Sequence, residues 1–192
     1  MGIYAQTPES RLSYPSLFEA RPPRQPGGAA KFEATFLVPK GSGTWMEDPA
    51  LADLRAAVVK ARDDKWPTKE ARPKGLRYPF LDGDATDEEG DRKFGEECAG
   101  HWVVRSSSHR KPEVVDPALK EVMNREEVYA GCYVKGYIDA YAYAGQESKG
   151  VTFGLAAIQK RRDGEPFGSD ARPAAASVFT AAFPRTRLWT GL

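Results

Sequence analysis

The sequence predicts one mainly β domain, a small barrel or sandwich of short strands with a single inserted helix. Segments 32–38, 101–108 and 129–143 have the alternation or the β-branched and aromatic content of strands, whereas only 48–66 has a helical apolar stripe. Fifteen prolines and eighteen glycines are spread along the 192 residues, which favours many short elements joined by turns. A chain of this length forms one domain of ordinary size.

The N-terminal part should contain the first strands. Residues 13–18 (SYPSLF) can form a short strand, and the proline- and glycine-rich run at 21–28 is typical of a loop or hairpin tip. The next strand covers 32–38, and Pro39 ends it. Its alternation predicts one buried face, made of Phe32, Ala34, Phe36 and Val38.

Residues 48–66 are the best helix candidate. Asp48 can cap the first turn, and Pro49 suits the first helical position. The helix should run to about Trp66, because Pro67 cannot continue it. Its apolar stripe consists of Leu51, Leu54, Ala57, Val58 and Ala61.

The middle of the chain combines irregular segments with one strand. Residues 67–100 are predicted to be irregular and include an acidic loop at 82–91. A strand at 101–108 leads to a basic turn at 109–112, and the segment from Val115 to Arg125 can form a short helix.

The strongest strand pattern lies near the C-terminus. Residues 129–143 and 151–160 are predicted to pair as a hairpin around a turn at 145–150. Beyond Arg161 the chain is rich in proline, alanine and glycine and ends in a basic, aromatic segment, FPRTRLWTGL.

Several function classes have no sequence support. The chain has no run of about 18 apolar residues and no signal-peptide layout at its N-terminus, and its two cysteines, Cys98 and Cys132, favour a reducing cytoplasm over a disulfide framework. No phosphate-binding loop, dinucleotide fingerprint or nucleophile elbow is present. The acidic loop lacks spaced metal ligands, and Cys98 with His101 lacks a second ligand pair. We therefore expect no enzyme activity, no metal site and no cofactor.

The net charge of +1 hides an uneven distribution. Residues 82–97 carry a balance of −6, whereas 55–78 carry +5 and 101–112 carry +3. Because the field at a binding groove is set by nearby charges, a near-neutral chain can still present a basic surface to a polyanion. A set of plain solvated faces is the alternative interpretation.

The segment 132–143 separates two kinds of side chain when it is placed on a strand. One face carries small and branched residues from Cys132 to Ala142, which suits a barrel interior. The other carries Lys135, Asp139 and four tyrosines that could stack on bases: Tyr133, Tyr137, Tyr141 and Tyr143. The opposite arrangement, with the tyrosines buried, is equally compatible with the pattern.

Basic clusters lie at strand ends and turns. One follows the strand at 101–108, one ends the strand at 151–160, and Arg72, Lys74 and Arg77 precede Tyr78. Together with the tyrosines they favour a groove for a nucleic-acid strand. The candidate phosphate contacts are Arg105, Arg110, Lys111, Lys135, Lys160 and Arg161.

A series of motifs over residues 11–168 resembles one phage and prophage family. The motifs are RLSYPSLF at 11–18, DGD at 82–84, RKP at 110–112, VVD at 114–116, VYAGCYVK at 128–135, GL at 154–155, QK at 159–160 and RDGEP at 162–166. Members of this family are described as single-stranded-DNA-binding proteins, similar to the OB-fold protein of short-tailed coliphages.

The resemblance implies an OB-like five-stranded barrel over residues 1–168, with the helix at 48–66 inserted, extra loops and extended termini. It implies sequence-independent, non-catalytic binding of single-stranded DNA in phage replication and recombination, in the cytoplasm of the host. Phage replication or recombination proteins and a second copy of the chain are the further partners to expect.

One segment departs from the coliphage proteins, which end in an acidic tail. Residues 169–192 form a tail that ends in basic and aromatic residues, so it is expected to be flexible or to dock on a partner, on DNA or on another protomer. A phage structural or assembly protein of similar β architecture, binding protein in place of DNA, is the alternative function.

Overall fold

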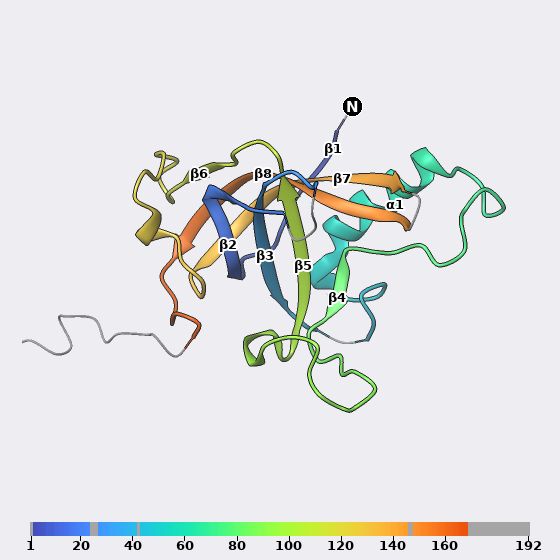
Figure 1. Ribbon diagram of the computed structural model, residues 1–192, viewed down its shortest axis with the longest axis horizontal. Helices are drawn as coiled ribbons and strands as arrows, with labels where there is room; N and C mark the ends of the chain where they lie inside the picture. Colours follow the sequence, from blue (N-terminus) through green and yellow to red (C-terminus); the bar gives the residue numbers. More distant parts are fainter. Residues whose placement is uncertain (1, 24–26, 42, 146–147, 169–192) are drawn as a thin grey trace, which may run out of the picture.

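Eight strands form one curled sheet with a single α-helix beside it, in the residues that the computed structural model describes: 2–23, 27–41, 43–145 and 148–168 (Figure 1). The strands are β1 (Ile3–Gln6), β2 (Ser10–Arg21), β3 (Lys31–Pro39), β4 (Phe80–Asp82), β5 (His101–Ser108), β6 (Glu113–Val115), β7 (Tyr133–Ala144) and β8 (Lys149–Arg162). The helices are α1 (Ala52–Lys65) and the 3-10 turns η1 (Pro49–Leu51), η2 (Glu96–Cys98) and η3 (Arg125–Glu127).

Five strands close into a ring. The pairings run from β2 through β3, β5 and β8 to β7, which pairs again with β2. Each pairing is antiparallel except that of β5 with β8. Two seams are short, since β2–β7 and β5–β8 share two residue pairs each. The predicted OB-like five-stranded arrangement is thus confirmed as a partly open ring and not a regular barrel.

The remaining strands extend the ring at its edges. Strand β1 lies beside β7 at residues 137–140, next to the place where β2 meets β7. Strand β4 pairs with β5, and β6 pairs with β8. No helix in the part of the chain that the structure describes is both long and apolar enough to cross a bilayer.

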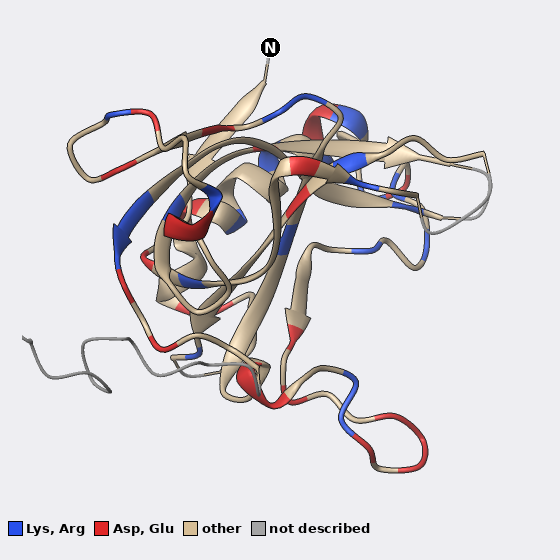
Figure 2. Ribbon diagram, turned by 60° about the vertical axis from the view of Figure 1, so that its left-hand side comes forward, with Lys and Arg blue, Asp and Glu red and all other residues tan. Residues whose placement is uncertain are grey.

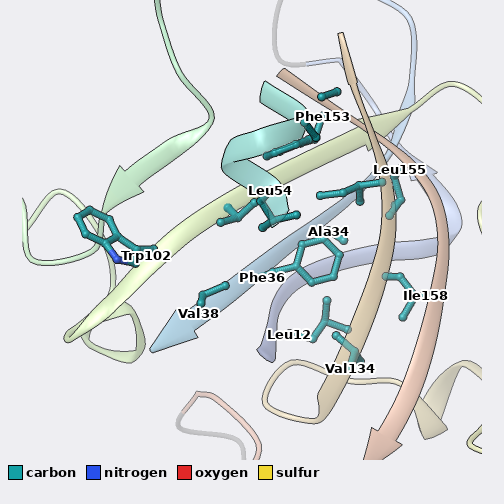
Figure 3. Close-up of a cluster of buried hydrophobic side chains, with 14 of the residues drawn as sticks. Leu12, Ala34, Phe36, Val38, Leu54, Trp102, Val134, Phe153, Leu155 and Ile158 are labelled. Atoms are coloured by element: carbon teal, nitrogen blue, oxygen red, sulfur yellow. The ribbon is translucent and has the colours of Figure 1, made fainter. Parts of the chain in front are cut away.

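The interior of the ring is apolar and tightly filled (Figure 3). Phe36 lies at its centre, and Gly136 on β7 approaches so closely that a Cβ atom there would clash with the Phe36 ring. Helix α1 packs against β1, β7 and β8 and inserts Leu54 into the same core. The predicted stripe is confirmed, because Leu51, Leu54, Ala57, Val58 and Ala61 are all buried.

Asp48 ties the helix to the sheet. Its carboxylate accepts hydrogen bonds from the N–H of Ala50 at 2.9 Å, which is the predicted cap, and also from the Gly41 N–H at 2.7 Å and the Trp102 indole N–H at 2.9 Å. Burial by itself would raise the pKa of this carboxyl, but the three donors outweigh burial and lower the pKa.

Strand β3 differs from its prediction because both of its faces are covered. Leu37 points away from the ring, yet it is fully buried in a second small cluster with Cys98 and Val103. The loop between β4 and β5 covers this cluster, so the half-buried pattern expected for residues 32–38 does not hold at their C-terminal end.

Several other expectations about elements were wrong or incomplete. Strands β1, β4 and β6 were not predicted, and β2 runs from Ser10 to Arg21, well beyond residues 13–18. The segment from Val115 to Arg125 has no helix before η3, because the Asp116 carboxylate accepts hydrogen bonds from the backbone of Ala118 and Lys120 and closes a turn. Strand β7 begins at Tyr133 and not at residue 129.

Candidate nucleic-acid interface

A bulge in β2 places Tyr14 on the outside of the ring. Leu12 and Leu17 are five residues apart, an odd number, yet both lie in the same core, so the alternation slips by one residue between them. The pairing with β3 shifts register between Ser13 and Ser16, and Tyr14 has a φ of 46°. A regular strand would turn Tyr14 inward, whereas here its side chain is 53% exposed.

Tyr14 lines a hollow on the outer face of β3 and β5. This central hollow has a volume of about 480 Å³, with Thr35, Arg105 and Ser107 among the residues of its floor and Lys93, Phe94 and Gly95 in one wall. The wall belongs to the loop between β4 and β5. Its acidic tip projects from the body of the molecule (Figure 2).

Two further hollows adjoin the central one and form a groove with it. A hollow of about 440 Å³ shares Arg105 and Thr152 with it and adds Arg77, Tyr78 and Tyr143. At the other end, a hollow of about 560 Å³ shares Arg21 and Glu33 with it and reaches Lys31 and His109. We call these three together the β3–β5 groove. A separate hollow of about 630 Å³ along β2 also shares Arg21 with the central one and is lined by Glu19 and Arg125.

The groove differs from the whole chain in charge. Its lining contains five lysine or arginine side chains and one acidic residue, Glu33, whereas the chain as a whole is nearly neutral. The five cations are Arg21, Lys31, Arg77, Lys93 and Arg105. The lining also contains four aromatic residues: Tyr14, Tyr78, Phe94 and Tyr143. Cations that can neutralise phosphates and rings that can stack on bases are the two components of a single-strand-binding surface.

The tyrosines of β7 lie on its outer face. Of the two orientations that the sequence left open for this strand, the one with the small residues inside is therefore the one that forms. Val134, Gly136, Ile138 and Ala140 are buried in the ring, and the tyrosines point outward. Tyr137 is 43% exposed and Tyr141 is 45% exposed. Tyr137 stacks on Tyr4 of β1, with ring centres 4.9 Å apart and an interplanar angle of 11°.

Other candidates from the sequence are engaged within the protein. The Tyr133 ring lies 3.3 Å from the guanidinium carbon of Arg162 and 5.8 Å from that of Arg11. Lys160 makes an ion pair with Asp163 at 2.7 Å, and Arg161 lies 3.9 Å from Glu9. Burial would lower the pKa of Lys160, but the Asp163 carboxylate outweighs burial and raises the pKa.

The ten candidate DNA contacts therefore lie in more than one place. Arg105 and Tyr143 line the same hollow of the groove. Arg110 and Lys111 are exposed just beyond β5, next to His109 at one end of the groove. Tyr133, Lys135, Tyr137, Tyr141, Lys160 and Arg161 lie on β7 and β8 and are not among the residues that line the groove. Their assignment as DNA contacts stays a prediction.

Both cysteines, Cys98 and Cys132, are buried and form no disulfide. Burial raises the pKa of the Cys98 thiol to about 11 and also raises that of Cys132. In the described ranges, no three or more His, Cys, Asp or Glu residues come together as a set of metal ligands.

A family model described as "Enterobacter phage Enc34, ssDNA-binding protein" matches residues 4–186. The chain belongs to this family. The match covers nearly the whole sequence and confirms the resemblance found in the motifs at 11–168. A comparison with curated proteins gives no match.

Solved structures similar to this member of the Enc34 family have the same fold. The single-stranded DNA-binding protein from bacteriophage Enc34 is 23% identical, with a TM-score of 0.64 over 92% of this chain and 90% of that one. The same phage protein in complex with ssDNA gives a TM-score of 0.65 at 23% identity, over 86% and 89%. The T7 single-stranded DNA-binding protein gp2.5 gives 0.58 at 14% identity, over 87% and 90%.

Sequence reasoning missed several groove residues of this family member. Tyr14 has no signal of its own, because its exposure depends on the bulge. Lys93 and Phe94 lie just after the predicted acidic loop at 82–91, in the stretch 67–100 that was predicted to be irregular. The basic–aromatic run at Arg77 and Tyr78 was visible, and the structure brings it beside Arg105. The tail at 169–192 lies outside the described residues.

Proposed function

We propose that this protein coats single-stranded DNA without sequence preference and holds the strand in the β3–β5 groove. The observation that supports the proposal most strongly is the run of five cations and four aromatic rings through three adjoining hollows. Rings stack on any base, and cations contact any phosphate, so such a groove does not require a particular sequence.

The position of the groove on the ring supports the same proposal. In OB folds the outer face of the second and third barrel strands, with the adjacent loops, binds oligonucleotides. Here β2, β3, β5, β7 and β8 are the ring strands in chain order, so β3 and β5 are the second and third. The β2–β3 connection lies at one end of the groove, and Tyr143, near the β7–β8 turn, lies at the other.

Family membership supports a role in phage DNA replication and recombination, in the cytoplasm of the host and without catalysis. One structural relative was solved in complex with ssDNA. Phage replication or recombination proteins and a second protomer are further partners that we propose on the family resemblance alone.

Fluorescence anisotropy of a labelled single strand of about 30 nucleotides tests the proposal, since one OB fold covers roughly 4–16 nucleotides. We expect binding that weakens steeply with salt and that duplex DNA does not compete away. The variant Arg105→Gln should bind more weakly. The slope of log K against log[salt] should become less negative by about 0.7, because one phosphate contact is lost. Lys60→Gln, which changes an exposed lysine on α1 outside the groove, is the control and should match the wild type. Absence of binding at low salt would refute the proposal.

A further inference from the structure

We propose that two carboxylates, Glu33 in the lining of the β3–β5 groove and Glu97 behind its wall, oppose the binding of DNA phosphates. They would hold the affinity of the groove for single-stranded DNA below the affinity that its cations alone would give. This inference rests on the proposed function. It concerns the regulation of the same site, and it predicts that the removal of a charge strengthens binding.

Glu33 is the acidic residue in the groove lining. It lies on β3, and its Oε2 atom is 3.7 Å from a terminal guanidinium nitrogen of Arg21 on β2. Both side chains remain about one-third exposed, so this ion pair faces solvent within the groove. A phosphate that binds Arg21 must approach the Glu33 carboxylate or displace it, and either event costs free energy.

Glu97 lies directly behind the wall of the same groove, against the lining residue Gly95. It belongs to η2, and its carboxylate folds back against Gly95 so closely that a Cβ atom at residue 95 would collide with it. The nearness of this carboxylate raises the pKa of the Tyr14 phenol. Tyr14 therefore lies beside a negative charge at the place where we propose that a nucleotide stacks.

The other acids of the loop have different partners. Lys40 makes ion pairs with both Asp82 and Asp84, and Asp84 also lies 3.7 Å from Arg92. Asp87 accepts hydrogen bonds from the backbone of Glu89 and Asp91 and so shapes the loop itself. Among the described carboxylates of this loop and the groove lining, Glu33 pairs with the lining residue Arg21, and Glu97 lies against the lining residue Gly95.

The two carboxylates could act on binding in either of two ways. The direction of the change in affinity when they are neutralised distinguishes these two roles. If Glu33 and Glu97 mainly repel phosphate, their neutralisation tightens binding. If they mainly hold Arg21 and Tyr14 in the bound geometry, their neutralisation loosens it. An exposed pair such as Arg21–Glu33 contributes little to stability, so Glu33→Gln should fold normally.

The experiment compares Glu33→Gln, Glu97→Gln and the double variant with the wild type, with single-strand affinity measured at low and high salt. Asp64→Asn is the control, because Asp64 pairs with Lys60 at 3.2 Å on α1, outside the groove. We expect each groove variant to bind about two- to fivefold more tightly at low salt, with a smaller gain at high salt and no change for the control.

Unchanged or weaker binding by Glu33→Gln and Glu97→Gln, with thermal unfolding like that of the wild type, would overturn the inference. If Glu97→Gln lowers the unfolding temperature, its affinity no longer reports on charge alone, and the affinity of Glu33→Gln then tests the inference by itself. A wild type that fails to bind single strands at all would instead overturn the proposed function, so the two failures are distinguishable.

Discussion

The guanidinium carbon of Arg105 lies 5.4 Å from the centre of the Phe94 ring and so joins the floor of the β3–β5 groove to its wall. Arg105 belongs to β5, and Phe94 belongs to the loop that covers Leu37 and Val103. A cation held over a ring in this way keeps its charge available to a phosphate beside it. The arrangement therefore places the proposed phosphate contact, Arg105, next to the proposed stacking surface, Phe94.

Removal of the groove rings should weaken binding. We expect Phe94→Ala and Tyr14→Ala each to reduce the free energy of binding to single strands by about 1–3 kcal/mol, because each ring offers one stacking surface. Anisotropy titrations against the wild type measure the effect. Circular dichroism must show an unchanged fold, and a variant with native fold and native affinity would remove that residue from the groove assignment.

The tyrosines of β7 test where the strand runs. If DNA lies in the groove, the double variant Tyr137→Ala/Tyr141→Ala should bind within about twofold of the wild type, since neither residue lines the groove. A loss of about 1–3 kcal/mol per ring would assign base stacking to the outer face of β7, as the sequence first suggested. Tyr143→Ala is the matched comparison, because Tyr143 lies on the same strand but lines the groove.

Replacement of Asp48 should destabilise the fold. An asparagine would turn an amide N–H₂ group toward one or two of the three donors that now point at the carboxylate, so we expect Asp48→Asn to lose about 1–3 kcal/mol of unfolding free energy. Denaturant unfolding measures this loss. Asp64→Asn, on the exposed side of α1, is the control and should change stability by less than about 0.5 kcal/mol.

The same carboxylate predicts a dependence on pH. Because the folded state lowers the pKa of Asp48, its contribution to stability is present above the pKa of the unfolded chain, about 3.9, and is lost as the pH falls through the lower folded value. The wild type should therefore lose its advantage over Asp48→Asn below about pH 4. An advantage that persists well below this range would show that the contribution is not that of the ionised form.

The contact between Gly136 and Phe36 predicts a second stability effect. Gly136→Ala should cost about 1–3 kcal/mol, because the added methyl group must displace the Phe36 ring in a filled core. In the double variant with Phe36→Leu the two costs should not add, since the smaller side chain leaves room. Gly145→Ala is the control, because the nearest atom to its Cβ would be 3.4 Å away.

The elements that the sequence predicted best are those with a local cause. The helix at 48–66 has a cap, a proline and an apolar stripe, and the faces of β7 follow from strict alternation. The covered face at Leu37 could not be predicted, because the loop that covers it lies more than fifty residues further along the chain. The groove at Arg105 could not be predicted either, because it brings together Tyr14, Thr35 and Thr152 from distant parts of the sequence. The high tyrosine content of β7 predicted a stacking surface on that strand, whereas the groove combines single aromatic residues from four separate segments.

The bulge at Tyr14 has an evolutionary consequence. One additional residue in β2 moves a ring from the interior to the surface, while Leu12 and Leu17 on either side both keep their places inside. An insertion, which needs no exchange of amino-acid type, can thus create a ligand contact on an existing barrel. Conversely, the deletion of a single residue at this position would convert the contact back into a core position, so length variation in β2 is a route by which relatives could gain or lose affinity for their ligand.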